Sequence, residues 1–135
     1  MPEADTILVV EDNEQNLELV EFLLDEAGLR VRKARDAEET REALATAQPD
    51  LVLMDMQLPG TDGLSLVEEI RRNPAMTYLP IIALTAHAMR GDRERFIAGG
   101  CDGYIAKPIN VASFVEEVRA ALAAARAHRP GERTA

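Results

Sequence analysis

Cysteine is scarce in this sequence, and long apolar stretches are missing. Cys101 is the only cysteine, which excludes an internal disulfide and a metal site built from several thiolates. No apolar run approaches the length needed to cross a membrane, and the segment from Met1 to Asp5 contains neither the basic nor the apolar part of a secretory signal. These absences predict a soluble protein of the cytoplasm that does not enter a membrane.

Positive charge is also in short supply. Lysine and arginine together number 15, against 24 aspartate and glutamate residues, which gives a formal net charge of −9. The whole of this net charge lies within residues 1–50. Because proteins bind the nucleic-acid backbone largely through cationic side chains, DNA and RNA are not expected partners.

The chain has the length of one domain and the pattern of an α/β fold. At 135 residues it is long enough to bury a core and too short for a second module. Short aliphatic runs alternate with longer amphipathic stretches, which is typical of repeated βα units on a mainly parallel sheet. We therefore expect a single domain over residues 1–127, and a flexible polar tail without an output domain over residues 128–135.

Five strands are predicted, over residues 6–10, 30–34, 51–54, 81–85 and 103–106. The first, third and fourth are almost continuously apolar, as expected for central strands that are covered by helices on both faces. The second mixes charged with apolar residues, which indicates an edge of the sheet.

Helices are predicted between and after the strands, over residues 15–27, 37–47, 63–72, 90–98 and 111–127. Asp36 is suited to an N-cap, and Gly28 and the pair Gly99-Gly100 are suited to C-caps. Turns are predicted at Pro59-Gly60 and Asp62-Gly63. The expected ends of the helices thus agree with the strand pattern.

Polar residues follow the carboxyl ends of four predicted strands. They are Glu11 and Asp12 after the first, Asp55 after the third, Thr85 at the end of the fourth, and Lys107 with Pro108 after the fifth. Parallel strands end at one edge of the sheet, where open α/β sheets bind ligands, so we expect these side chains to meet. Two carboxylates about 4 Å apart repel each other by about 4 kcal/mol at an effective dielectric constant of about 20, so the cluster needs a cation. Oxygen ligands in small number favour Mg²⁺ over Ca²⁺.

An aspartate beside Mg²⁺ suggests phosphoryl chemistry. Asp55 could attack phosphorus and form an aspartyl phosphate, while the metal ion and Lys107 neutralise the phosphoryl oxygens. Thr85 could then hydrogen-bond to the new group. A single aspartate at a strand end is usually a helix cap or a solvated loop residue, but the coincidence of a polar residue at each expected strand end argues against that interpretation.

Four segments resemble the receiver domain of two-component response regulators, and together they span nearly the whole chain. They are residues Val9 to Asn13, Leu53 to Gly63, Leu84 to Ala86 and Tyr104 to Pro108. The resemblance implies a flavodoxin-like (βα)5 doubly wound parallel sheet with strand order 2-1-3-4-5, and a cis peptide bond between Lys107 and Pro108. Finer matches to single-domain regulators, shared with receivers of hybrid histidine kinases, occur at Glu11 to Asn16, Met56 to Pro59, Met89 to Asp92 and Gly99 to Asp102.

The resemblance assigns roles by position. Asp55 would accept a phosphoryl group from a histidine kinase or a histidine phosphotransfer protein, and Lys107 would pair with that group. Mg²⁺ would be held by Asp12, Asp55 and the backbone carbonyl of Gln57, with Glu11 orienting metal-bound water. Many relatives have aspartate in place of Glu11, so its longer side chain leaves the coordination geometry open.

Thr85 and Tyr104 resemble the switch pair of this family. Phosphorylation would draw the threonine inward, the aromatic ring would follow, and the surface around the fourth helix, fifth strand and fifth helix would change. Tyr104 could instead be an ordinary aromatic residue at the edge of the core. Gln57 and His87 flank the entrance to the site in relatives and would tune the rate of dephosphorylation. His87 is disfavoured as a metal ligand because Mg²⁺ prefers oxygen.

The first predicted helix combines an acidic stripe with a broad apolar arc. The stripe consists of Glu14, Glu18, Glu21 and Asp25. The arc is wider than core packing requires, so part of it should reach the surface. Leu19 and Phe22 lie at its far side, and we expect them to dock the helices of the kinase or phosphotransfer protein, as this helix does in relatives. The alternative is that they only cover the flank of the sheet.

Three functions remain open. The first is a single-domain switch of a bacterial phosphorelay, or a relay intermediate related to hybrid kinases, that contacts a downstream protein and catalyses only its own phosphorylation and slow autodephosphorylation. The second is a phosphatase similar to the haloacid dehalogenases, but that group has a second acid where this chain has Gln57. The third is a flavodoxin-like cofactor binder, which would need a glycine-rich loop in place of Glu11-Asp12-Asn13.

Overall fold

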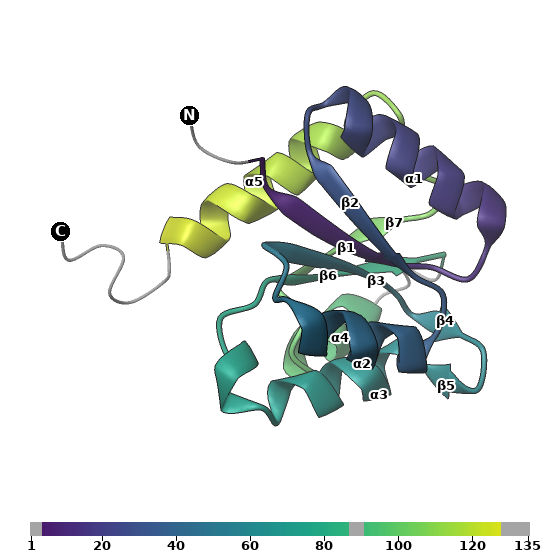
Figure 1. Cartoon of the computed structure of the whole chain (residues 1–135). Coiled ribbons are helices and arrows are strands. Elements are labelled where there is room, and N and C mark those ends of the chain that lie inside the picture. The colour runs from purple at the N-terminus through teal and green to yellow at the C-terminus, as the bar shows by residue number, and fades with distance from the viewer. Residues whose placement is uncertain (1–3, 87–90, 128–135) are drawn as a thin grey trace, which may run out of the picture.

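The computed structural model describes residues 4–86 and 91–127, and its centre is a parallel sheet of five strands (Figure 1). The strands are β1 (Thr6–Val10), β2 (Arg30–Ala34), β3 (Leu51–Asp55), β6 (Ile81–Thr85) and β7 (Gly103–Ala106). Their order in the sheet is β2-β1-β3-β6-β7, with every neighbouring pair parallel. The predicted fold class and strand order are confirmed, with β6 and β7 as the fourth and fifth strands of the prediction.

Helices cover both faces of this sheet. Figure 1 shows α1 (Glu14–Glu26) and α5 (Phe114–Ala127) on one face, and α2 (Ala37–Thr46), α3 (Gly63–Arg71) and α4 (Asp92–Ala98) on the other. Each face has its own apolar core, one containing Leu24 and Phe114 and the other Leu66 and Phe96. β3 and β6 are buried at every position and β2 lies at an edge, as their sequences predict.

The ends of the helices follow the capping residues. The side chain of Asp36 accepts a hydrogen bond from the backbone N–H of Glu39 at 2.8 Å, and Gly28 follows α1 with a φ of +84°, so both predicted caps are confirmed. The predicted start of the last helix at residue 111 is wrong. The Asn110 side chain accepts a hydrogen bond from the N–H of Ala112 at 3.0 Å, and the resulting turn delays α5 to Phe114.

A short hairpin directly after β3 was not predicted. It consists of β4 (Gln57–Leu58) and β5 (Thr61–Asp62), joined through the expected Pro59-Gly60 turn. A 3-10 helix, η1 (Pro74–Met76), also escaped prediction. The hairpin returns the chain to the end of β3, where the N–H of Gly63 donates to the carbonyl of Met56 at 3.0 Å. Within the described residues, no helix is long and apolar enough to span a membrane.

Candidate functional site

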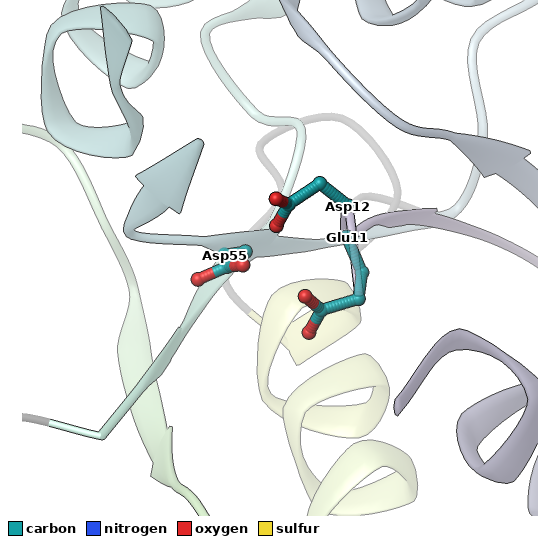
Figure 2. A group of neighbouring side chains, drawn as sticks. All are labelled: Glu11, Asp12 and Asp55. Atoms are coloured by element: carbon teal, nitrogen blue, oxygen red, sulfur yellow. The ribbon is translucent and has the colours of Figure 1, made fainter. Parts of the chain in front are cut away.

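The carboxyl ends of β1 and β3 bring three carboxylates together. Val10 and Met54 are in register in the sheet, so the residues that follow β1 lie beside Asp55 at the end of β3. Figure 2 shows the carboxylates of Glu11 and Asp12 gathered near that of Asp55. One oxygen from each of the three lies within 4.8 Å of the other two. Glu11 and Asp55 are buried, whereas Asp12 is exposed.

Lys107 enters the cluster from the loop after β7. Its backbone N–H donates to the carbonyl of Thr85 at 2.8 Å, and its bond to Pro108 is cis. The Nζ atom lies 2.8 Å from Oε1 of Glu11 and 3.3 Å from Oδ1 of Asp55. The ammonium group therefore bridges the two buried acids, and it lies nearer to Glu11.

The remaining carboxylate contacts are with the backbone. The N–H of Gln57 donates to Oδ1 of Asp55 at 2.9 Å, and the N–H of Asn13 donates to Oε2 of Glu11 at 3.1 Å. Oε1 of Glu11 is buried and accepts no hydrogen bond of good geometry from the described residues, although the Lys107 ammonium is close. This oxygen keeps the capacity for a further ligand.

The electrostatics of the cluster are unbalanced. Burial, assisted by the adjacent Glu11 carboxyl, raises the pKa of Asp55 from 3.8 to about 6, in spite of the Gln57 hydrogen bond and the Lys107 charge. Burial acts to lower the pKa of Lys107, but Glu11 and Asp55 together outweigh it and raise this pKa. Three acids thus face one lysine, and additional positive charge would stabilise the ionised site.

The donor set fits a hard divalent cation. All the candidate ligand atoms are carboxylate oxygens from Glu11, Asp12 and Asp55, and one of the Glu11 oxygens has no hydrogen bond. Mg²⁺ prefers oxygen ligands, uses one or two carboxylates and retains several waters. The exposed side chain of Asp12 leaves the cluster open to solvent on one side, which suits such partial hydration.

The three acids and Lys107 line one cleft, of about 640 Å³, together with Asn13, Glu14, Asn16, Gln57 and Ala86. Gln57 is exposed at its rim. Thr85 is buried at the end of the adjacent strand and lines a neighbouring cavity of about 350 Å³ between α3 and α4. The predicted acids and lysine therefore meet directly, while Thr85 lies beside them.

The other predicted residues lie farther from the acids. Tyr104 is half-buried on β7, and its Cα is in register with that of Ala83, two residues before Thr85. On α1, Phe22 is 61% exposed and Leu19 is half-buried. His87 lies outside the described residues.

Gly63 is a site-forming residue whose role sequence reasoning missed. A Cβ atom at this position would lie 2.3 Å from the backbone oxygen of Asp55 and 2.7 Å from the Cα of Met56, well inside contact distance. From the sequence, the Asp62-Gly63 pair predicts only a turn. Only the packed structure reveals that glycine is needed for α3 to begin directly against the end of β3.

Comparison with known families agrees with this architecture. The family model of the response regulator receiver domain matches residues 7–119, which is most of the chain. This chain belongs to the response regulator receiver family. The polar-differentiation response regulator DivK of Brucella anthropi is 38% identical over 122 residues, covering 90% of this chain and 98% of the relative. The finer sequence resemblance noted above is to this same single-domain regulator.

Solved receiver structures are similar as well. A protein from Chloroflexus aurantiacus, assigned to the response regulators, superposes with a TM-score of 0.84 at 33% identity, covering 89% of this chain and 98% of the other. The receiver domain of a sensor histidine kinase from Pseudomonas aeruginosa has a TM-score of 0.80 at 36% identity, with 89% and 98% covered. That structure has a magnesium ion coordinated in its active-site cleft.

Proposed function

We propose that this receiver domain accepts a phosphoryl group on Asp55 from a histidine kinase or a histidine phosphotransfer protein. The observation that carries the proposal is the placement of Asp55, buried at the end of β3 with Lys107 at 3.3 Å and two further acids within 4.8 Å. The phosphorus–nitrogen bond of the donor breaks as phosphorus bonds to an Asp55 oxygen, and the imidazole leaves with the electron pair. A pKa of about 6 leaves Asp55 largely ionised at neutral pH, as a nucleophile requires.

Mg²⁺ is the cofactor that we propose, held by Asp12, Asp55 and the backbone carbonyl of Gln57, with Glu11 orienting water. When bound, it neutralises charge on the phosphoryl oxygens and on the acids. The magnesium-bound receiver from Pseudomonas aeruginosa supports this choice, as does the oxygen donor set here.

Lys107 and Thr85 are proposed as the groups that respond to the new phosphoryl group. The Lys107 ammonium already lies between Glu11 and Asp55, so it needs little movement to pair with a phosphoryl oxygen. Thr85 is one strand away, and Leu84 beside it is in register with Asp55. A shift of its hydroxyl toward the phosphoryl group would remove it from its cavity under α4.

We further propose that Thr85 and Tyr104 form the switch. Tyr104 lies on the strand next to Thr85 and on the same face of the sheet, because Ala83, its partner in register, is two residues before Thr85. Movement of the threonine changes the space available to the ring. The affected surface consists of α4, β7 and α5.

Gln57 and His87 are proposed to tune the lifetime of the phosphate. Gln57 is exposed at the rim of the cleft, where it would limit access of water. The aspartyl-phosphate half-life should therefore change in Gln57→Ala and in His87→Ala. An unchanged half-life in both variants refutes this role.

The docking surface for the phosphodonor is proposed at α1, through Leu19 and Phe22. A phenylalanine with 61% of its surface exposed is a candidate anchor for an apolar pocket on a partner. Alanine at both positions should slow phosphotransfer from a kinase but leave phosphorylation by acetyl phosphate unchanged. Equal rates from the kinase in the folded double variant would exclude this surface.

We propose signalling through phosphorylation-dependent contact with a downstream protein, without turnover of a separate substrate. The 38% identity to a DivK relative over 122 residues supports a DivK-like role, and a relay intermediate of the hybrid-kinase type is the alternative. A phosphatase of the haloacid dehalogenase type is disfavoured, because the residue two positions after Asp55 is Gln57, which cannot serve as a general acid.

The direct test is incubation with acetyl phosphate and Mg²⁺, followed by intact mass measurement. One labile phosphoryl adduct is expected, and it should be absent in Asp55→Asn and after chelation of the metal. Asp62→Asn, which changes an exposed aspartate at the end of the hairpin and keeps an oxygen that can cap α3, is a matched control that should retain the adduct. If the unsubstituted protein forms no adduct with any phosphodonor, the proposed function is wrong.

A further inference from the structure

Tyr104 contacts the part of the core that α4 covers. Its half-buried ring packs against a cluster that includes Phe96 of α4 and Ala83 of β6. It therefore lies where a side chain of α4 can act directly on the ring.

Arg93 of α4 makes such a contact. Its guanidinium carbon lies 5.9 Å from the centroid of the Tyr104 ring, within the range of a cation–π interaction. The Arg93 side chain is exposed, and among the ion pairs of the described residues none involves Arg93. Tyr104 is thus the partner of this charge.

The other arginine at this end of α4 is engaged differently. Arg95 lies over the ring of its own neighbour Phe96, at 5.1 Å, and its NH2 atom is 3.5 Å from Oδ1 of Asp92. Both of these contacts are made within α4. Arg95 therefore carries the same charge on the same helix without facing Tyr104.

We propose that Arg93 holds Tyr104 in its present position and thereby sets the balance between the two states of the switch. This inference rests on the proposed function, in which the ring moves when Asp55 is phosphorylated. The contact stabilises only the state in which the guanidinium faces the ring. Since binding and conformation are reciprocally linked, and when this state predominates in the free protein, removing the contact tightens binding of a phosphoryl group by the factor by which it shifts the equilibrium. For an exposed cation–π contact this factor is roughly 2- to 5-fold.

The direction in which phosphoryl affinity changes distinguishes release of Tyr104 from a simple loss of positive charge. Removing a positive charge weakens the attraction of the whole protein for an anion, whereas releasing Tyr104 strengthens binding of a phosphoryl group. Arg93→Gln and Arg95→Gln lower the net charge equally. Only Arg93→Gln removes the contact with Tyr104.

The test is titration of the full chain with beryllofluoride, a phosphoryl analogue, in the presence of Mg²⁺. The sequence has two tyrosines and no tryptophan, so ring-labelled tyrosine yields two sets of NMR signals, which Tyr78→Phe assigns. In Arg93→Gln we expect roughly 2- to 5-fold tighter binding, together with Tyr104 signals in the free protein displaced toward their bound positions. Arg95→Gln should not tighten binding, and Arg93→Gln should have no further effect in a Tyr104→Leu background.

The possible failures are distinguishable. If the unsubstituted protein binds no beryllofluoride, the proposed function and this inference are both overturned. If it binds, and Arg93→Gln leaves the affinity and the Tyr104 signals unchanged, only the role of Arg93 is overturned. Equal tightening in Arg95→Gln would also overturn it, because the effect would then belong to charge on α4 in general.

Discussion

Replacing Asp55 with asparagine should stabilise the metal-free protein at neutral pH. Asparagine is nearly the same size, and its oxygen can still accept the hydrogen bond from the N–H of Gln57, which is 2.9 Å from Oδ1 of Asp55. The substitution removes a buried negative charge that lies beside Glu11 and is only partly compensated by Lys107. The free energy of unfolding therefore increases where Asp55 would otherwise be ionised.

The magnitude follows from the pKa of Asp55, which burial and the neighbouring Glu11 raise from 3.8 to about 6. At about 1.4 kcal/mol for each tenfold change in proton affinity, the ionised side chain destabilises the fold by about 3 kcal/mol. The folded state binds the proton more tightly than the unfolded state. The stability that comes from the bound proton is thus fully present below pH 3.8, and it is lost as the pH rises from there through about 6. The stability gain in Asp55→Asn should approach zero near pH 4 and reach its full size above pH 7.

The assay is urea unfolding at a series of pH values between about 4 and 8, with a chelator present throughout. Glu18→Gln, which neutralises an exposed acid on α1, is the matched control and should change stability little at any pH. Two results would refute the reasoning. One is a variant that is no more stable than the unsubstituted protein at pH 7.5, and the other is a gain of equal size at pH 4 and pH 7.5.

Three further predictions concern the metal ion, Gly63 and Arg71. Mg²⁺ at 100 times its dissociation constant should raise the free energy of unfolding by about 2.7 kcal/mol in a thermal or urea titration, and Asp12→Ala should greatly reduce the effect. Gly63→Ala should lower the free energy of unfolding by about 1–3 kcal/mol and slow acetyl-phosphate labelling, because its Cβ would lie 2.3 Å from the backbone oxygen of Asp55. Gly103→Ala, whose Cβ would be 3.5 Å from its nearest neighbour, is the control and should lower this free energy less. Arg71→Met should lower the free energy of unfolding in urea by about 2 kcal/mol, because the guanidinium donates to the carbonyls of Gly100 and Met76 and to Asp102. Arg72 is exposed, so Arg72→Met should leave this free energy nearly unchanged.

Most of the fold was predictable because its determinants are local. Strands covered on both faces must be apolar throughout. Helix ends need residues such as Asp36, which accepts a hydrogen bond from a free backbone N–H, and Gly28, which adopts a positive φ. The β4–β5 hairpin was not predictable, since each strand has only two residues and carries no detectable periodicity. The delayed start of α5 likewise depends on one side-chain hydrogen bond from Ala112 to Asn110.

The sequence by itself determined which residues reach the functional edge, because the carboxyl ends of parallel strands must share it. That rule alone predicts that Glu11, Asp12, Asp55 and Lys107 lie together. Only the tertiary structure decided how these groups are paired. Lys107 lies nearer to Glu11 than to Asp55, α3 begins against the Asp55 carbonyl, and Arg93 faces Tyr104. Each of these depends on distances of a few ångströms between segments distant in the chain, which periodicity and motifs do not encode.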